Sequence, residues 1–281
     1  YIFTIGLLLL VLVVGMSKGV AQRWINIFGV SFQPSELAKI TLVLMLSWYM
    51  TRYKNYVCDP VSRKNRFIYG IVIPCGIIAC PVVLVAAERH LSGTIIIGLI
   101  GILVMFCAGS SIWWMLLMAL VGGGGVAAIA LFTDYTKERL LIWENPWAYP
   151  LEGGWQTIQG LLAIGSGGLF GLGLGNSRQK YSYVSQPQND FIFTIVCEEL
   201  GFIGALAVLA LFIAFIWRII YVAKKKAKDN FSMLVCIGIA IKMAIQVLLN
   251  TAVVTNTIPN TGISLPFFSY GGSSLLMLFL E

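Results

Sequence analysis

The stretch IWWMLLMALVGGGGVAAIALF occupies residues 112–132 and contains no charged side chain. A helix needs about 20 consecutive apolar residues to cross the hydrocarbon layer of a bilayer. A helix also pairs its backbone N–H and C=O groups within the segment, which lipid requires and an isolated strand cannot do. Residues 112–132 are therefore predicted to form a membrane-spanning helix.

Seven further apolar stretches are also predicted to be spans. They cover residues 2–16, 36–50, 67–87, 94–108, 190–222, 231–254 and a run that starts near 269. The composition agrees, since the chain is 58% hydrophobic and only 11% charged. These features predict an all-α polytopic membrane protein, a helical bundle with about eight spans, and argue against a soluble protein.

Basic residues between the spans predict the orientation of the chain, because cytoplasmic loops are enriched in Lys and Arg. One basic group follows the second span and another lies at the end of the sixth: Arg52, Lys54, Arg63, Lys64 and Arg66, then Arg218, Lys224, Lys225, Lys226 and Lys228. Both groups place residues 17–33, 89–93, 133–189 and 255–268 on the outer face. The net charge of +7 reflects these loops and does not indicate nucleic acid binding.

We expect one integral-membrane domain over residues 1–281, with a long extracellular loop at 133–189 inside it. A helical period over 155–164 predicts that this loop is ordered. The chain begins with Tyr1 rather than Met, and its last apolar run, 275–281, is too short to cross a bilayer. A fragment that lacks helices at both ends is therefore expected. The six cysteines have no spacing typical of a disulfide framework or a zinc site.

Polar chemistry is concentrated where the long loop meets the next span. Residues 163–175 are rich in glycine, and Arg178, Lys180 and Asp190 follow. Glycine allows a close approach of the backbone to a ligand, and Arg and Lys bind anions. An ionisable residue beside a membrane span is a functional-site hypothesis by default.

Four blocks of sequence carry a family resemblance that covers nearly the whole chain. They are QPSELAK at 33–39, the glycine-rich 165–175 with SRQK at 177–180, NDFIF at 189–193 with EELG at 198–201, and LPFFSYGGSS at 265–274. These blocks resemble the motifs of the SEDS family of shape, elongation, division and sporulation proteins. The resemblance implies a ten-helix peptidoglycan glycosyltransferase that polymerises lipid II at the outer face of the bacterial cytoplasmic membrane. The eight spans would match its third to tenth helices, and VSQPQND at 184–190 is closest to the division or spore-cortex branch.

The resemblance also implies partners and a cofactor. Lipid II and the nascent glycan strand are the expected substrates, and membrane lipids surround the helices. A class B penicillin-binding protein that cross-links the new strand is the expected partner, together with divisome proteins. A divalent cation, Mg²⁺ or Mn²⁺, is expected at the pyrophosphate, although no cluster in the chain has a diagnostic metal-ligand spacing.

Asp190 resembles the essential aspartate of the family. The reaction needs a base that takes the proton from the acceptor sugar's 4-hydroxyl as this oxygen attacks the anomeric carbon of the donor. The alternative is a helix N-cap, a position that Asp favours. A helix N-terminus lowers the pKa of a carboxylate whereas a general base needs a higher one, so desolvation by bound substrate is expected to compensate.

Further residues are predicted to bind substrate, each with a simpler alternative. Arg178, Lys180 and Arg23 are cations that suit the leaving pyrophosphate, or that contact lipid headgroups instead. Glu36 and Lys39 lie three residues apart on one helix face, so they either pair with each other or line a cavity. The other candidates are Glu88 at the end of the third span, Gln156 and Gln159 on the helix expected at 155–164, and Ser273, whose alternative role is helix packing.

Lys242, Gln246 and Asn250 form one polar line on the seventh span. Such a line usually makes hydrogen bonds between helices. An unpaired Lys242 near the middle of a span is costly, so a hydrated cavity or a buried carboxylate partner such as Glu198 or Glu199 is expected. A polar line also suits a lipid II flippase, which stays an alternative, as does a noncatalytic scaffold for a transpeptidase.

His90, the only histidine, is expected to be solvated at the interface.

Overall fold

The computed structural model describes residues 1–18, 21–27, 30–59, 61–88, 90–132, 134–151, 153–180 and 188–281. The chain forms two compact units. Unit 1 comprises Tyr1–Val121, Ile216–Ile245 and Gly272–Glu281, and unit 2 comprises Gly122–Phe215 and Gln246–Gly271. Three helices, α7 (Ile112–Phe132), α10 (Ile192–Lys226) and α11 (Asn230–Val254), contribute residues to both units.

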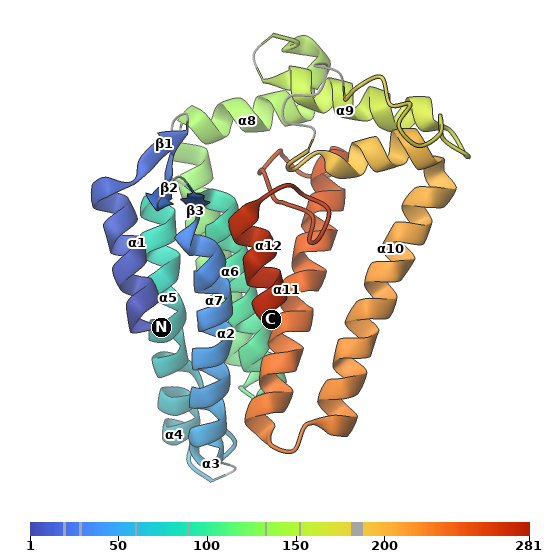
Figure 1. Cartoon of the computed structure of the whole chain (residues 1–281). Helices are drawn as coiled ribbons and strands as arrows, with labels where there is room; N and C mark the ends of the chain where they lie inside the picture. Colours follow the sequence, from blue (N-terminus) through green and yellow to red (C-terminus); the bar gives the residue numbers. More distant parts are fainter. Residues whose placement is uncertain are drawn as a thin grey trace. The chain divides into compact units, whose positions relative to one another are not determined.

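Unit 1 is built around α2 (Pro34–Arg52), which contacts α1 (Ile2–Val14), α5 (Ile73–Ala87), α6 (Leu91–Cys107) and α12 (Gly272–Leu280) (Figure 1). Proline is favourable in the first turn of a helix, where its missing N–H has no partner to lose, and Pro34 occupies that place in α2. Short segments complete the unit at the ends of the long helices. They are β1 (Met16–Lys18), β2 (Ala21–Ile27), β3 (Val30–Phe32), α3 (Lys54–Val57), α4 (Arg63–Phe67) and η1 (Ile68–Val72).

The strands β1, β2 and β3 form an antiparallel sheet in that order. The pattern of spans and basic loops predicts only an outer loop in this region. The three-residue strands β1 and β3 are too short to show an alternation of apolar and polar positions. The sequence of β2, AQRWINI, does not alternate strictly, so the pattern does not predict the sheet.

Unit 2 contains α8 (Asp134–Glu144), η2 (Pro146–Ala148), α9 (Gly154–Gly167) and parts of α10 and α11. Its hydrophobic core includes Phe191, Phe193, Phe212, Val253 and Leu265. The turn that precedes α10 therefore ends at a buried aromatic residue, Phe191, and this fixes the position of its neighbour, Asp190.

Helix α10 is interrupted at Gly201, whose φ of 68° and ψ of −170° are not helical (Figure 1 shows the bend). The glycine-rich loop fills the break. The N–H groups of Leu172 and Gly173 donate to the carbonyls of Glu198 and Glu199, both at 3.0 Å. In return, Phe202 N–H donates to the Gly168 carbonyl at 2.9 Å. The loop thus pairs backbone groups that the kink would otherwise leave without partners, as buried polar groups require.

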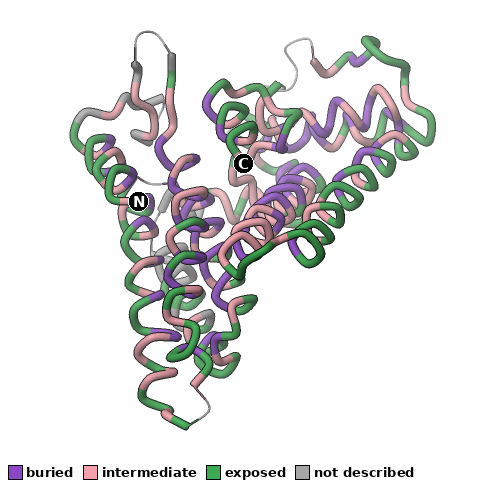
Figure 2. The backbone as a smooth tube through the Cα atoms, turned by 60° about the horizontal axis from the view of Figure 1, so that its bottom comes forward, coloured by how far each residue is buried: buried purple, intermediate pink, exposed green. Residues whose placement is uncertain are grey.

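The prediction of an all-α polytopic membrane protein is confirmed. In the described residues, each of the eight predicted spans overlaps a helix. Residues 112–132 match the bounds of α7, whereas residues 67–87 comprise the end of α4, η1 and α5, and the predicted span 2–16 extends past the end of α1. Within the part of the chain that the structure describes, three helical segments are long and apolar enough to cross a membrane: Arg63–Ala87, α10 and α11. Exposed residues run along the helices (Figure 2), and many of them are large and apolar, as lipid-facing surfaces require, among them Leu206, Leu211, Ile213 and Trp217.

Candidate functional site

Asp190 lies in unit 2, in the turn that leads into α10. The next residue, Phe191, is 1% exposed and packs against Gly160 of α9. A Cβ atom placed on Gly160 would lie only 2.9 Å from the Phe191 ring. Glycine at position 160 therefore lets α9 approach the turn closely.

Asn250 of α11 fixes the backbone of the same turn. Its Nδ2 donates to the carbonyl oxygens of Asp190 at 2.8 Å and Ile263 at 2.6 Å. On the other side, Tyr270 N–H donates to the Gln188 carbonyl at 2.7 Å. Asn250 thus joins two loops instead of a second helix, and its role beside Asp190 was not predicted. The one signal in the sequence was its place on the polar line of the seventh span.

The Asp190 carboxylate is partly buried, and desolvation raises its pKa above the ordinary value of 3.8, despite hydrogen bonding by its own N–H and the nearby charge of Arg139. Among the described residues, no N–H of the first turn of α10 donates to it, so the helix-cap alternative has no hydrogen bond to support it. Burial within the protein itself therefore supplies the upward pKa shift that was expected to need bound substrate.

A hydrogen-bonded loop borders this carboxylate. Arg139 Nη1 of α8 donates to the Asn260 carbonyl at 2.7 Å, and Asn260 Nδ2 donates to Gln156 Oε1 of α9 at 3.3 Å. Asn260 Oδ1 in turn accepts from Gly262 N–H at 3.2 Å. A Cβ atom on Gly262 would lie 3.4 Å from Asp190 Oδ2. Gln156 is thereby connected to the surroundings of Asp190, while Gln159, another predicted residue of α9, is buried.

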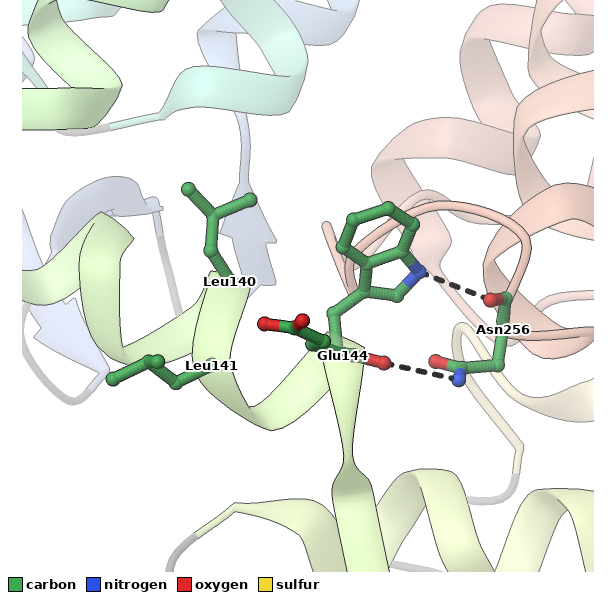
Figure 3. Close-up of a pocket in the computed structure, with 5 residues that line it drawn as sticks. Leu140, Leu141, Glu144 and Asn256 are labelled. Carbon is green, nitrogen blue, oxygen red and sulfur yellow. Dashed lines mark hydrogen bonds between the residues drawn. The ribbon is translucent and has the colours of Figure 1, made fainter.

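The same loop borders a cavity of about 870 Å³ in unit 2 (Figure 3), lined by Leu140, Leu141, Trp143, Glu144 and Asn256. Trp143 Nε1 donates to the Asn256 carbonyl at 3.0 Å, and Asn256 Nδ2 donates to the Trp143 carbonyl at 3.3 Å. None of the predicted site residues lines this cavity. Its reciprocal hydrogen bonds hold α8 against the loop that follows α11.

Arg178 and Lys180 follow the glycine-rich loop, and the two acids of α10 organise this segment. Glu198 accepts hydrogen bonds from the Ser177 hydroxyl and from Arg178 N–H, the latter at 3.0 Å. Lys180 Nζ lies 2.9 Å from Glu199 Oε1 and also donates to the Gly175 carbonyl. Lys180 is thus partly engaged in holding the loop, whereas the Arg178 side chain is exposed.

The remaining predicted residues, Arg23, Glu36, Lys39, Glu88 and Ser273, belong to unit 1. Lys39 Nζ contacts Glu36 at 2.7 Å, so the predicted pairing is present, and both side chains are buried. Ser273 is buried at the start of α12, and Arg23 lies on β2.

Glu88 is only 2% exposed, and neither carboxylate oxygen has a hydrogen-bond partner among the described residues. Burial raises its pKa to about 7, while the charge of Arg23 opposes this shift.

The expectation of a solvated His90 is wrong, because the ring is buried and its Nδ1 lies 3.5 Å from Ser35 Oγ. Burial, together with the charges of Arg23 and Lys39, lowers the pKa of His90 to about 3.

The prediction that Lys242 pairs with Glu198 or Glu199 is also wrong. Lys242 forms an ion pair with Glu281, which follows α12, whereas Glu198 and Glu199 bind the segment around Arg178. The position of Lys242 near the middle of its predicted span indicates that it needs a partner. Which carboxylate takes this role depends on tertiary packing.

Fold and site together define a multi-pass helical membrane protein with ionisable residues beside its spans. The whole chain, residues 1–281, matches the family model of the cell cycle proteins FtsW, RodA and SpoVE, and the chain belongs to this family.

Similar proteins and a solved structure support this family membership. Stage V sporulation protein E of Bacillus subtilis is 40% identical over 277 residues, which are 98% of this chain and 73% of that protein. A probable peptidoglycan glycosyltransferase FtsW of Coxiella burnetii is 34% identical and covers 99% of this chain and 74% of its own length. A chain from a peptidoglycan synthase complex that coordinates polymerization and crosslinking superposes with a TM-score of 0.76 and 28% identity, over 98% of this chain and 75% of that one.

Proposed function

We propose that the protein is an inverting peptidoglycan glycosyltransferase that polymerises lipid II at the outer face of the cytoplasmic membrane. The observation that carries this proposal is Asp190, a carboxylate with a raised pKa and with its backbone fixed by Asn250. Family membership supports the reaction, since relatives at 34–36% identity are named probable peptidoglycan glycosyltransferases. The similarity to the sporulation protein and to FtsW favours a role in division or in the spore cortex.

In this mechanism, Asp190 accepts the proton of the acceptor sugar's 4-hydroxyl. The hydroxyl oxygen forms a bond to the anomeric carbon of the donor sugar, and the bond from that carbon to the lipid pyrophosphate breaks with inversion. A base contributes most when its pKa lies near the working pH, so the raised pKa of Asp190 suits this role better than an ordinary aspartate would.

Negative charge grows on the leaving pyrophosphate, and cations placed beforehand stabilise it. We assign this role to Arg178 and Lys180. Lys180 also forms an ion pair with Glu199. Arg23, Glu36, Lys39, Glu88 and Ser273 of unit 1, and Gln156 and Gln159 of unit 2, are proposed to bind the substrate's sugar and phosphate groups.

A divalent cation remains a prediction. The described residues contain no group of three or more His, Cys, Asp and Glu side chains that would hold a metal ion. They therefore do not fit a site built from protein ligands alone, and no step of the proposed mechanism uses a metal.

A class B penicillin-binding protein is the proposed partner. The similarity to a chain of a peptidoglycan synthase complex supports a partner that cross-links the strands which this protein would make. Divisome proteins are proposed as further partners on the basis of the FtsW relatives.

The test of the function is Asp190→Asn in the purified full-length protein. This change keeps the side chain's size and removes the base, so polymerisation of lipid II should fall by at least about a hundredfold, within the range of general-base contributions. Binding of lipid II and the thermal midpoint should stay within error. Near-parental polymerisation would contradict the proposal, and lipid II transport by an inactive parent would favour the flippase alternative.

A further inference from the structure

Four buried charged side chains gather in unit 1. Glu36 and Lys39 lie on α2, Lys242 on α11, and Glu281 directly follows α12. Glu36, Lys39 and Lys242 are at most 8% exposed, and the Glu281 side chain is 3% exposed. Two acids and two bases balance each other, as buried charges must.

The four side chains form two ion pairs that also interact with each other. Lys39 Nζ lies 2.7 Å from both carboxylate oxygens of Glu36, and Lys242 pairs with Glu281. Lys242 interacts electrostatically with both members of the α2 pair. His90 also faces this group and interacts with Glu36 and Lys39.

Stability alone does not explain the Lys242–Glu281 pair. Moving two charges out of water costs several kcal/mol per ion, and replacing a buried ion pair by apolar residues of similar volume is often neutral or stabilising. A Lys within a membrane span is therefore expected to serve a specific purpose, which its neighbours on α2 indicate.

The pair also has unused hydrogen-bonding capacity. An ammonium group has three donors, and among the described residues Lys242 Nζ donates only to Glu281 Oε1. Glu281 Oε2 is buried without a partner there. A buried polar atom left unpaired costs about 1–3 kcal/mol, so these groups favour a polar molecule beside them.

Glu281 also connects the pair to α12. This helix contacts α2 and carries Ser273, a proposed substrate-binding residue, at its start. The ion pair thus joins α11 to the helix that positions Ser273, next to the helix that bears Glu36 and Lys39.

We propose that Lys242, held by Glu281, is a positioning residue that orients the Glu36–Lys39 pair toward the polar head group of the lipid-linked substrate. This inference rests on the proposed function. It requires a cation at position 242, because a carboxylate there would repel Glu36 and attract Lys39 away from it.

The test compares neutral and exchanged pairs in the full-length protein. Lys242→Met with Glu281→Leu removes both charges and leaves none unpaired. Lys242→Glu with Glu281→Lys keeps an attractive pair but reverses its order. Lys242→Arg is the conservative variant, and Met243→Leu, a volume-conserving change at the adjacent buried position, is the matched control.

The neutral pair should keep the thermal midpoint and raise the KM for lipid II by about tenfold, as expected when coupled charges are lost, with a smaller change in kcat. The exchanged pair should not restore KM, whereas Lys242→Arg should stay within about threefold of the parent and Met243→Leu should match it.

A folded neutral or exchanged pair with parental KM would overturn the proposal, because the ion pair would then be structural. Failure of both double variants to fold would overturn it for the same reason. Direct binding of lipid II, measured in parallel, distinguishes a failure of the proposed function from a failure of the role assigned to Lys242. A parent that binds lipid II without polymerising it would overturn the proposed function, and the binding affinities of the variants would still decide the role of Lys242.

Discussion

At Asp190, two opposing influences act on one carboxylate. Burial raises its pKa, while its own N–H and the charge of Arg139 lower it, and the net shift is upward from 3.8. A group that works as a base acts only when deprotonated. The direction of this shift therefore determines how polymerisation depends on pH.

We predict that kcat for polymerisation falls as pH is lowered through a pKa above 3.8, and that it is constant well above that pKa. The measurement is a pH profile of lipid II polymerisation under saturating substrate. Glu88 is the necessary control, because its pKa of about 7 adds a second titration. The acidic limb should persist in Glu88→Gln, and its disappearance there would assign the limb to Glu88 instead of Asp190.

Glu88 itself has a consequence for stability. Its pKa is raised from 4.5 to about 7 in the folded protein, so the folded state binds more protons than the unfolded state between these values. Stability should therefore fall as pH rises through this window, by about 3 kcal/mol at most.

Replacing Glu88 by Gln should remove this slope and raise the thermal midpoint at pH values above 7, since a neutral amide avoids burying a charge. Thermal melts of parent and variant in detergent across this range test the prediction. An unchanged slope would show that other groups, not Glu88, cause the pH dependence. If Glu88 also binds substrate, as proposed, the stabilised variant should have a higher KM for lipid II.

At the scale of elements, the interrupted helix α10 and the glycine-rich loop depend on each other. Gly201 has a φ of 68°, and a Cβ atom there would lie 2.3 Å from the Gly171 nitrogen and 2.6 Å from the Leu169 carbonyl oxygen. Both contacts are with backbone atoms, which cannot move aside as a flexible side chain can. The loop that carries Arg178 and Lys180 is therefore positioned by glycine at 201.

Gly201→Ala should lower the thermal midpoint, since a positive φ alone costs about 1–3 kcal/mol for a residue with a side chain. It should also reduce polymerisation, because the loop would shift away from Glu198 and Glu199. Gly165→Ala is the control. This helical position of α9 has no atom within 4 Å of a new Cβ, and alanine should stabilise it by about 0.5–1 kcal/mol. Equal effects of the two substitutions would show that the close contacts at Gly201 do not matter.

These elements also show what could be predicted from sequence. The spans and α9 were predicted correctly because apolar length and helical period are local properties. The break at Gly201 was not, since it is defined by a loop that precedes it by many residues. Asp190 was predicted through the family resemblance, and it stays a prediction. Its neighbours Arg139, Asn250 and Gly262 approach it only after folding. For Lys242, the need for a partner was predictable, whereas its identity, Glu281, required the packing of α12.

At the scale of the whole molecule, the charge distribution predicts which ends of the helices face the cytoplasm. The basic end of α10 is ordered by aromatic contacts, with Arg218 and Lys225 lying 5.4 and 5.2 Å from the centre of the Tyr221 ring. Cations at this end and after α2 agree with a cytoplasmic location. The same charge distribution predicts that the loop between α7 and α10, which carries the proposed pyrophosphate contacts, faces outward.

Single cysteines test this orientation in intact cells. Leu151→Cys and Leu174→Cys, at exposed positions of the long loop, should react with a thiol reagent that cannot cross membranes. Val61→Cys, which is equally exposed in the loop after α3, should react only after the cells are permeabilised, and the exposed native Cys58 should behave in the same way. All six native cysteines are replaced by Ser in these variants, and Cys58 is tested in a variant that keeps only this native cysteine. Labelling with the opposite sidedness would place Arg178 and Lys180 in the cytoplasm and would contradict polymerisation at the outer face.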